Sequence, residues 1–131
     1  MAGDGRTITR LPLVKDDGGR HENEYRDCVV RAFAIATMVP YDYWHAKLAA
    51  YGRQRRRGTM RSVFKSLIDN EWGWRHVERP GCTLKRFVEH HTRGRYLVRI
   101  RGHMLAVIDG RVHDIIHSAP GSRVIEYWVV P

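Results

Sequence analysis

The sequence predicts an α+β domain in which helices come first along the chain and a β-sheet comes last. Between residues 27 and 91, apolar residues recur at helical spacing, whereas from residue 95 onwards they form short alternating or continuous runs typical of strands. The dipeptide Asp109–Gly110 divides the second half as a two-residue hairpin turn, which joins antiparallel strands. Helices followed by antiparallel strands are the element order of an α+β fold.

Four helices are expected in the first part of the chain. Residues 27–40 are apolar on nearly all sides, which indicates a buried helix, and Asp27 is a suitable N-cap that places Cys28 in the first turn. Pro40 ends this helix. The other helices are expected over residues 41–52, 60–72 and 83–91, the last with Thr83 as its N-cap.

The strands are expected mainly at the C-terminal end. An earlier segment, residues 7–14, fits a short strand, and Pro12 restricts that strand to a sheet edge because it cannot donate to a ladder. The remaining strands are expected over residues 95–102, 103–108, 111–116 and 122–130.

The length and composition are those of one globular domain. The chain has 131 residues, of which 43% are apolar and 28% are charged. We expect residues 1–24 to form a flexible N-terminal segment and residues 25–131 to form the domain. No apolar run is long enough to span a membrane, and the first residues lack the apolar stretch of a secretory signal. Two cysteines are too few for a disulfide framework, so we expect free thiols and a cytoplasmic protein.

Cys28, His103 and Asp114 are the candidate catalytic residues. A helix start lowers the pKa of a cysteine thiol, as a nucleophile requires. The two-residue turn pairs Leu105 with Asp114, so Asp114 lies diagonally from His103 on the same face, within reach of a hydrogen bond. In this interpretation His103 is the general base, and Asp114 fixes the orientation and tautomer of its ring.

Two stretches, DCVVRA (27–32) and GHMLAVIDGRVHD (102–114), resemble motifs of small bacterial and phage-encoded papain-like cysteine peptidases. The resemblance implies a papain-like fold, in which a central buried helix bearing the cysteine packs on a C-terminal antiparallel sheet. It implies a peptidase, isopeptidase or amidase that acts on a protein or peptide and needs no metal or organic cofactor. It also implies a phage or mobile-element origin and action on a host protein in the bacterial cytoplasm.

The sequence departs from the papain-like pattern at the oxyanion hole. The family usually has a glutamine shortly before the cysteine, but the only glutamine here is Gln54. Asn23, five residues before Cys28, is the best amide substitute, whereas an ionised Glu22 only accepts hydrogen bonds. Loss of one oxyanion donor costs on the order of 100- to 1000-fold in rate.

The strong positive charge supports an alternative interpretation. The net charge is +9, which favours a polyanionic or acidic partner. A catalytically inactive papain-like fold that binds nucleic acid or an acidic host protein is therefore the second hypothesis. A cell-wall amidase or peptidase is the third, although no export signal is present. The loop GRQRRRG (52–58) holds the candidate nucleic-acid-binding residues Arg53, Arg55, Arg56 and Arg57.

Three other features are interpreted as structural. Arg31 lies within the apolar helix, so we expect it to be paired with a carboxylate. Cys82 has no histidine motif that points to it. The stretch HDIIH (113–117) is not expected to bind a metal, because histidines on a strand lack the helical spacing of metalloprotease ligands.

Overall fold

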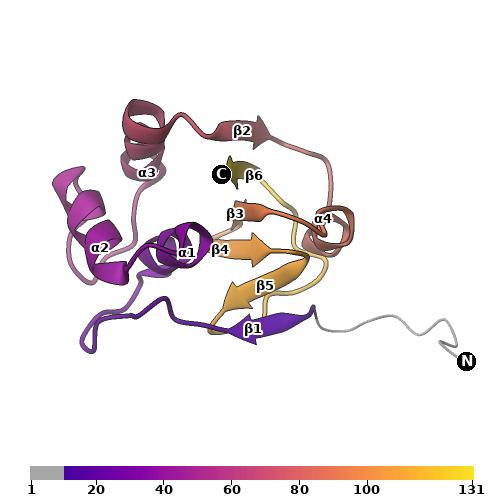
Figure 1. The fold of residues 1–131 in the computed structure, drawn as a ribbon, viewed down its shortest axis with the longest axis horizontal. Helices are drawn as coiled ribbons and strands as arrows, with labels where there is room; N and C mark the ends of the chain where they lie inside the picture. The colour runs from indigo at the N-terminus through magenta and orange to yellow at the C-terminus, as the bar shows by residue number, and fades with distance from the viewer. Residues whose placement is uncertain (1–10) are drawn as a thin grey trace, which may run out of the picture.

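The computed structural model describes residues 11–131, which form an α+β fold with helices on both faces of one sheet (Figure 1). The helices are α1 (Cys28–Thr37), α2 (Tyr41–Ala50), α3 (Arg61–Leu67), its π-helical continuation η1 (Ile68–Trp72), and α4 (Leu84–His90). The strands are β1 (Leu13–Lys15), β2 (Arg75–Glu78), β3 (Arg95–Ile100), β4 (His103–Ile108), β5 (Arg111–Asp114) and β6 (Glu126–Val130). No helix within residues 11–131 is long and apolar enough to cross a bilayer.

The sheet is mixed, which corrects the expected C-terminal antiparallel sheet. Its strand order is β1-β5-β4-β3-β6-β2, and β1 runs parallel to β5. The edge position predicted for the first strand is confirmed, although residues 7–10 of that prediction lie outside the described residues. Strand β2 was not predicted, because its four residues show too few alternations to reveal a strand. The stacking of His76 on Trp128 of β6, with ring centroids 4.6 Å apart, helps to hold β2 in place.

The predicted β4–β5 hairpin is confirmed in its register. Ile108 pairs with Arg111 across the turn, and the pairing continues in step along both strands. Asp109 and Gly110 both have positive φ, at 49° and 76°, as a tight two-residue hairpin turn requires. This register brings the beginning of β4 beside the end of β5, where two of the candidate catalytic residues lie.

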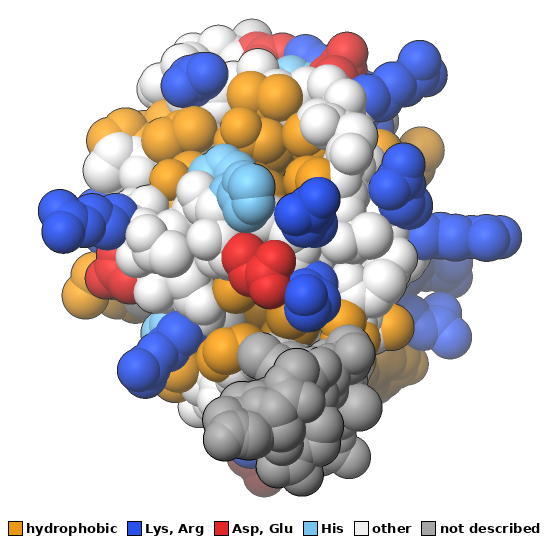
Figure 2. Space-filling view, turned by 90° about the vertical axis from the view of Figure 1, so that its right-hand side faces the viewer, with side chains coloured by type: hydrophobic (Ala, Val, Ile, Leu, Met, Phe, Trp, Pro, Cys, Tyr) orange, Lys and Arg blue, Asp and Glu red, His pale blue; other side chains and the backbone are white. Residues whose placement is uncertain are grey.

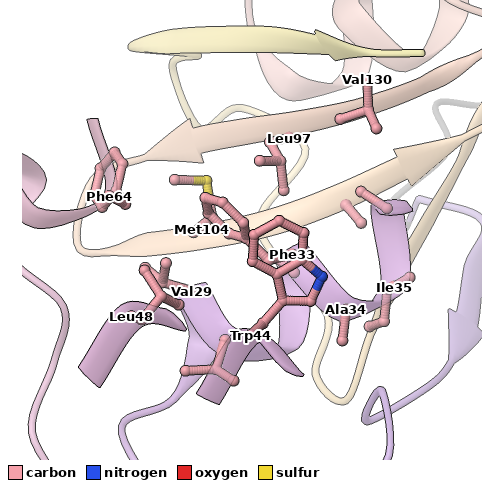
Figure 3. Close-up of a cluster of buried hydrophobic side chains, with 14 of the residues drawn as sticks. Val29, Phe33, Ala34, Ile35, Trp44, Leu48, Phe64, Leu97, Met104 and Val130 are labelled. Carbon is pink, nitrogen blue, oxygen red and sulfur yellow. The ribbon is translucent and has the colours of Figure 1, made fainter. Parts of the chain in front are cut away.

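Helix α1 is the centre of the larger apolar cluster (Figure 3). Eight of its ten residues are buried, as the apolar sequence predicted. Phe33 packs edge-on against Trp44 of α2, and Leu97 of β3 lies in the same cluster. Leu105 of β4 faces the other way, into the cluster covered by α4. Alternate residues of the sheet therefore supply the two layers of the core.

Residues 11–24 are joined to the rest of the fold. They include β1 and the buried Leu11 and Glu24. Gly18, at φ +68°, lies so close to α1 that a Cβ atom there would be 3.2 Å from the Arg31 carbonyl oxygen and from the Ala34 Cβ. A side chain at this position would force the loop away from α1.

The first turn of α1 corrects one expectation about Asp27. Asp27 precedes the helix, but its carboxylate makes no capping hydrogen bond. Instead it accepts from the Tyr41 hydroxyl at 2.7 Å and from the guanidinium groups of Arg20 and Arg31. Charged donors bind a buried carboxylate more strongly than a neutral backbone N–H does, so the Asp27 side chain turns towards them.

Candidate active site

Cys28 is the first residue of α1 and is half-buried. The first backbone hydrogen bond at this end of the helix runs from the Arg31 N–H to the Asp27 carbonyl, at 2.9 Å. The Cys28 N–H therefore has no acceptor within the helix, and it points out of the helix start. This end of the helix stabilises negative charge on the thiol or on an oxygen bound beside it.

His103 is the first residue of β4 and lies between Cys28 and Asp114. Its Nε2 is 2.6 Å from the Asp114 Oδ2. The ring also lies beside the Cys28 thiol, close enough that each group shifts the pKa of the other. Gly102, at φ +69°, makes the turn that delivers His103 to this position. The structure thus brings together the three residues that the sequence selected.

The layer in which these residues meet differs from simple strand alternation. Leu105 and Val107 share the parity of His103, and they pack in the α4 layer. His103, however, contacts Cys28 of α1 on the other side of the sheet. Alternation therefore predicted that His103 and Asp114 meet, but not which layer they face. Both residues lie at strand ends, where side chains are not confined between sheet neighbours.

The thiol and the imidazole shift each other towards an ion pair. Burial opposes charge on Cys28, but hydrogen bonds from His103 and the Met104 N–H lower the pKa of the thiol below its ordinary value. Burial likewise opposes charge on His103, but its hydrogen bonds with Asp114 and Cys28 raise the pKa of the imidazole to about 9. Cys82 shows the opposite behaviour, because burial raises the pKa of its thiol. The two shifts favour a thiolate–imidazolium pair for Cys28 and not for Cys82.

Asp114 is held by a buried network that extends to Asp27. Its Oδ1 accepts from the Ile115 N–H at 2.7 Å and lies 3.6 Å from a guanidinium nitrogen of Arg31. Arg31 also binds the fully buried Asp27, so the predicted pairing of Arg31 with a carboxylate is confirmed. Arg31 thus links the start of the Cys28 helix to the carboxylate that orients His103.

A pocket of about 220 Å³ opens beside the Cys28 thiol. Its walls come from α1, the loop before α3, α3 itself, and the facing ends of β3 and β4. Thr59 is notable because its Oγ1 is buried and has no hydrogen-bond partner among the described residues. Thr59, Arg61 and Arg99 were not predicted for this site, because no local sequence pattern joins residues 59–61 to a residue of β3. The lining residues are Cys28, Val29, Gly58, Thr59, Arg61, Phe64, Arg99, Gly102, His103 and Met104.

Asn23, the predicted oxyanion donor, is not brought into this pocket. The residue is exposed, and its backbone carbonyl accepts a hydrogen bond from Arg56 Nε at 2.8 Å. It is not among the residues that line the pocket beside Cys28. The structure places Thr59 there instead.

The basic loop is only partly available for a ligand, which corrects the role predicted for Arg53. The Arg53 side chain is 1% exposed and is paired with the buried Glu24 at 3.2 Å. Burial opposes charge on Glu24, but hydrogen bonds from Arg53 and His45 lower the pKa of its carboxyl to about 2. Arg56 is exposed, although its backbone N–H also binds Glu24. Arg55 and Arg57 are exposed as well.

Positive charge is not confined to this loop. Figure 2 shows Lys and Arg side chains around the face of the molecule on which α4 lies, with apolar side chains exposed between them. The basic side chains are therefore not confined to the 52–58 loop.

One group of possible metal ligands occurs in the described part of the chain, outside the HDIIH stretch. Single ligand atoms of His76, Glu78 and Glu126 lie within 4.8 Å of one another. Glu126, however, already accepts hydrogen bonds from the guanidinium groups of Arg61 and Arg99. Two neighbouring positive charges disfavour a metal cation at this position.

The chain matches no protein-family model, and neither a curated protein nor a solved structure is similar to it.

Proposed function

We propose that the chain is a papain-like cysteine hydrolase that cleaves an amide, isopeptide or related acyl bond of a protein or peptide. The observation that carries this proposal is the placement of His103 between Cys28 and the buried Asp114, with Cys28 and His103 lining one pocket. His103 Nε2 is 2.6 Å from Asp114, and the same ring lies close enough to the Cys28 thiol that the two groups shift each other's pKa. Nucleophile, base and orienting group in this order are the arrangement that activates a thiol.

The geometry supports a two-step acyl transfer. The Cys28 thiolate attacks the carbonyl carbon, and the His103 imidazolium gives its proton to the leaving nitrogen as the carbon–nitrogen bond breaks. The amine departs and a thioester to Cys28 remains. Neutral His103 then takes a proton from a water molecule as the water oxygen attacks the thioester carbon. The carbon–sulfur bond breaks, which regenerates the Cys28 thiolate and releases the product as a carboxylic acid. Asp114 stabilises the imidazolium in both steps.

Two donors near Cys28 are suited to the negative oxygen that forms during each attack. One is the Cys28 N–H, which has no acceptor within the helix. The other is the hydroxyl of Thr59, a residue that lines the same pocket; this hydroxyl is buried and has no hydrogen-bond partner within residues 11–131. We assign Thr59 the role that a glutamine amide usually has in papain-like enzymes. The proposal thereby removes the need for Asn23 in this role.

Hydrolysis of p-nitrophenyl acetate tests the proposed function without knowledge of the natural substrate. We expect a burst of one p-nitrophenolate per chain as Cys28 is acetylated, followed by slower turnover. Cys28→Ser should abolish the burst, whereas Cys82→Ser should retain it. A burst that survives Cys28→Ser, or the absence of a burst from the unmodified chain, would contradict the proposal. The latter result would favour an inactive fold that binds a polyanion.

Thr59→Val should lower the rate of this acetylation by roughly tenfold or more, because one oxyanion donor is lost. Valine has nearly the same shape as threonine, so the pocket should keep its form. Thr92→Val is the matched control, since Thr92 is exposed and does not line the pocket. Equal burst rates for the two variants would remove Thr59 from the oxyanion site.

A further inference from the structure

Two guanidinium groups line the pocket beside the candidate nucleophile. Arg61 comes from α3 and Arg99 from β3, and both share the pocket with Cys28 and His103. Their side chains are partly exposed, at 39% and 27%, so a ligand in the pocket can reach them. None of the described residues that line the pocket is acidic.

Glu126 holds the two guanidinium groups in place from behind. This carboxylate is 2% exposed and accepts hydrogen bonds from Arg61 at 2.8 and 2.9 Å, from Arg99 at 2.5 Å and from His76 at 2.7 Å. Burial opposes charge on Glu126, but these bonds lower the pKa of its carboxyl to about 2, so it is ionised at neutral pH. One carboxylate therefore faces two arginines.

Hydrogen-bonding capacity remains on both arginines. Among the described residues, Arg99 uses only its Nε, which leaves Nη1 and Nη2 without partners. Arg61 uses Nε and Nη2, which leaves Nη1. Glu78 also contacts Arg61 at 3.2 Å, but it is 63% exposed and does not line the pocket. The pocket thus presents unused guanidinium donors fixed by a buried partner.

We propose that this pocket is a subsite that binds a carboxylate of the substrate beside the bond that Cys28 attacks. This inference rests on the proposed hydrolase function and adds the class of substrate. The planar guanidinium group is well matched to a carboxylate, and a pocket of about 220 Å³ has room for an acidic side chain. The carboxylate belongs either to an Asp or Glu side chain next to the cleaved bond or to a free peptide C-terminus.

A pair of matched electrophiles tests the side-chain source. Acetyl-Ala-Glu chloromethyl ketone and acetyl-Ala-Gln chloromethyl ketone differ only in carboxylate against amide. In each, the Cys28 thiolate forms a carbon–sulfur bond and chloride leaves. We expect the Glu probe to label Cys28 roughly tenfold faster than the Gln probe, after correction for the ratio measured with glutathione.

Variants of the two arginines test which residues set this preference. Arg99→Gln and Arg61→Gln should each lower the Glu-to-Gln ratio several-fold, and Arg99→Lys should restore part of it. Arg111→Gln removes the same charge from an exposed position outside the pocket and should leave the ratio unchanged. A cooperative thermal unfolding transition establishes that each variant is folded. If one of the two arginine variants misfolds, the other still tests the proposal.

A second arm tests a free C-terminus as the source. Acetyl-Ala-Ala with a free carboxylate should protect Cys28 from iodoacetamide better than acetyl-Ala-Ala amide does, if the terminal carboxylate is what the arginines bind. The subsite is supported by a preference for the Glu probe, or by protection by the terminal carboxylate, provided that the effect is lost in Arg99→Gln. The absence of both overturns it.

The failure of this inference is distinguishable from that of the proposed function. The absolute labelling rate of Cys28 by the Gln probe reports on the nucleophile, whereas the Glu-to-Gln ratio reports on the arginines. Suppose that the Gln probe labels Cys28 fast, that the Glu-to-Gln ratio equals the ratio measured with glutathione, and that the terminal carboxylate gives no protection. This result overturns the subsite and leaves the assignment of the nucleophile intact. If the Gln probe labels Cys28 no faster than it labels glutathione, the proposed hydrolase function is contradicted, and the Glu-to-Gln ratio is still measurable.

Discussion

Replacing His103 with alanine should slow alkylation of Cys28 by iodoacetamide at pH 6 by roughly ten- to hundredfold. The imidazolium both hydrogen-bonds to the thiolate and attracts it, and these two effects help to offset the burial that raises the thiol pKa. Without His103, the pKa of Cys28 rises and the thiolate fraction at pH 6 falls accordingly. The rate is measured by mass spectrometry of the modified chain in a Cys82→Ser background.

His90→Ala is the matched control for this experiment, because His90 is an exposed histidine at the end of α4 and does not line the pocket. Its removal should leave the alkylation rate unchanged. Equal rates for the two alanine variants would show that the thiol of Cys28 is not activated by His103.

Asp27→Asn should destabilise the fold by about 3–5 kcal/mol, the cost of breaking a buried ion pair. The Asp27 carboxylate is fully buried and binds Arg20, Arg31 and the Tyr41 hydroxyl. An asparagine there leaves the charge of Arg31 with the more distant Asp114 as its partner, at 3.6 Å. Urea unfolding at pH 7 measures the change in the free energy of unfolding.

Asp42→Asn is the control for Asp27→Asn. Asp42 is also paired, with His21, but its side chain is 82% exposed. Its replacement should change the free energy of unfolding by no more than about 0.5 kcal/mol. A change of less than about 1 kcal/mol for Asp27→Asn would contradict the structural role that we assign to the buried network.

The parts of the site that were predictable depend on short-range patterns. A proline and a largely apolar run define the helix that begins at Cys28, and a two-residue turn fixes the register that brings His103 to Asp114. These relations span at most about a dozen residues, so turn chemistry and strand alternation are enough to derive them.

The parts that were missed depend on contacts between distant segments. Glu24 holds Arg53, and Glu126 holds Arg61, across separations of 29 and 65 residues. No periodicity marks such ion pairs, and for this reason Arg53 was a candidate nucleic-acid-binding residue in the sequence. The parallel pairing of β1 with β5 is equally non-local. Thr59 lies in the loop before α3, which is also held by non-local contacts such as the hydrogen bond from the Arg56 N–H to Glu24.

The pH dependence of Cys28 alkylation by iodoacetamide in the Cys82→Ser chain tests the central claim most directly. The ion pair predicts that the rate rises through a first transition below about pH 8.5, because the pKa of the thiol is lowered. A second transition in the rate should follow near pH 9, where the imidazolium of His103, which Asp114 and Cys28 stabilise, loses its proton. A single transition at or above about pH 8.5 would be the behaviour of an isolated thiol and would contradict a catalytic Cys28–His103 pair.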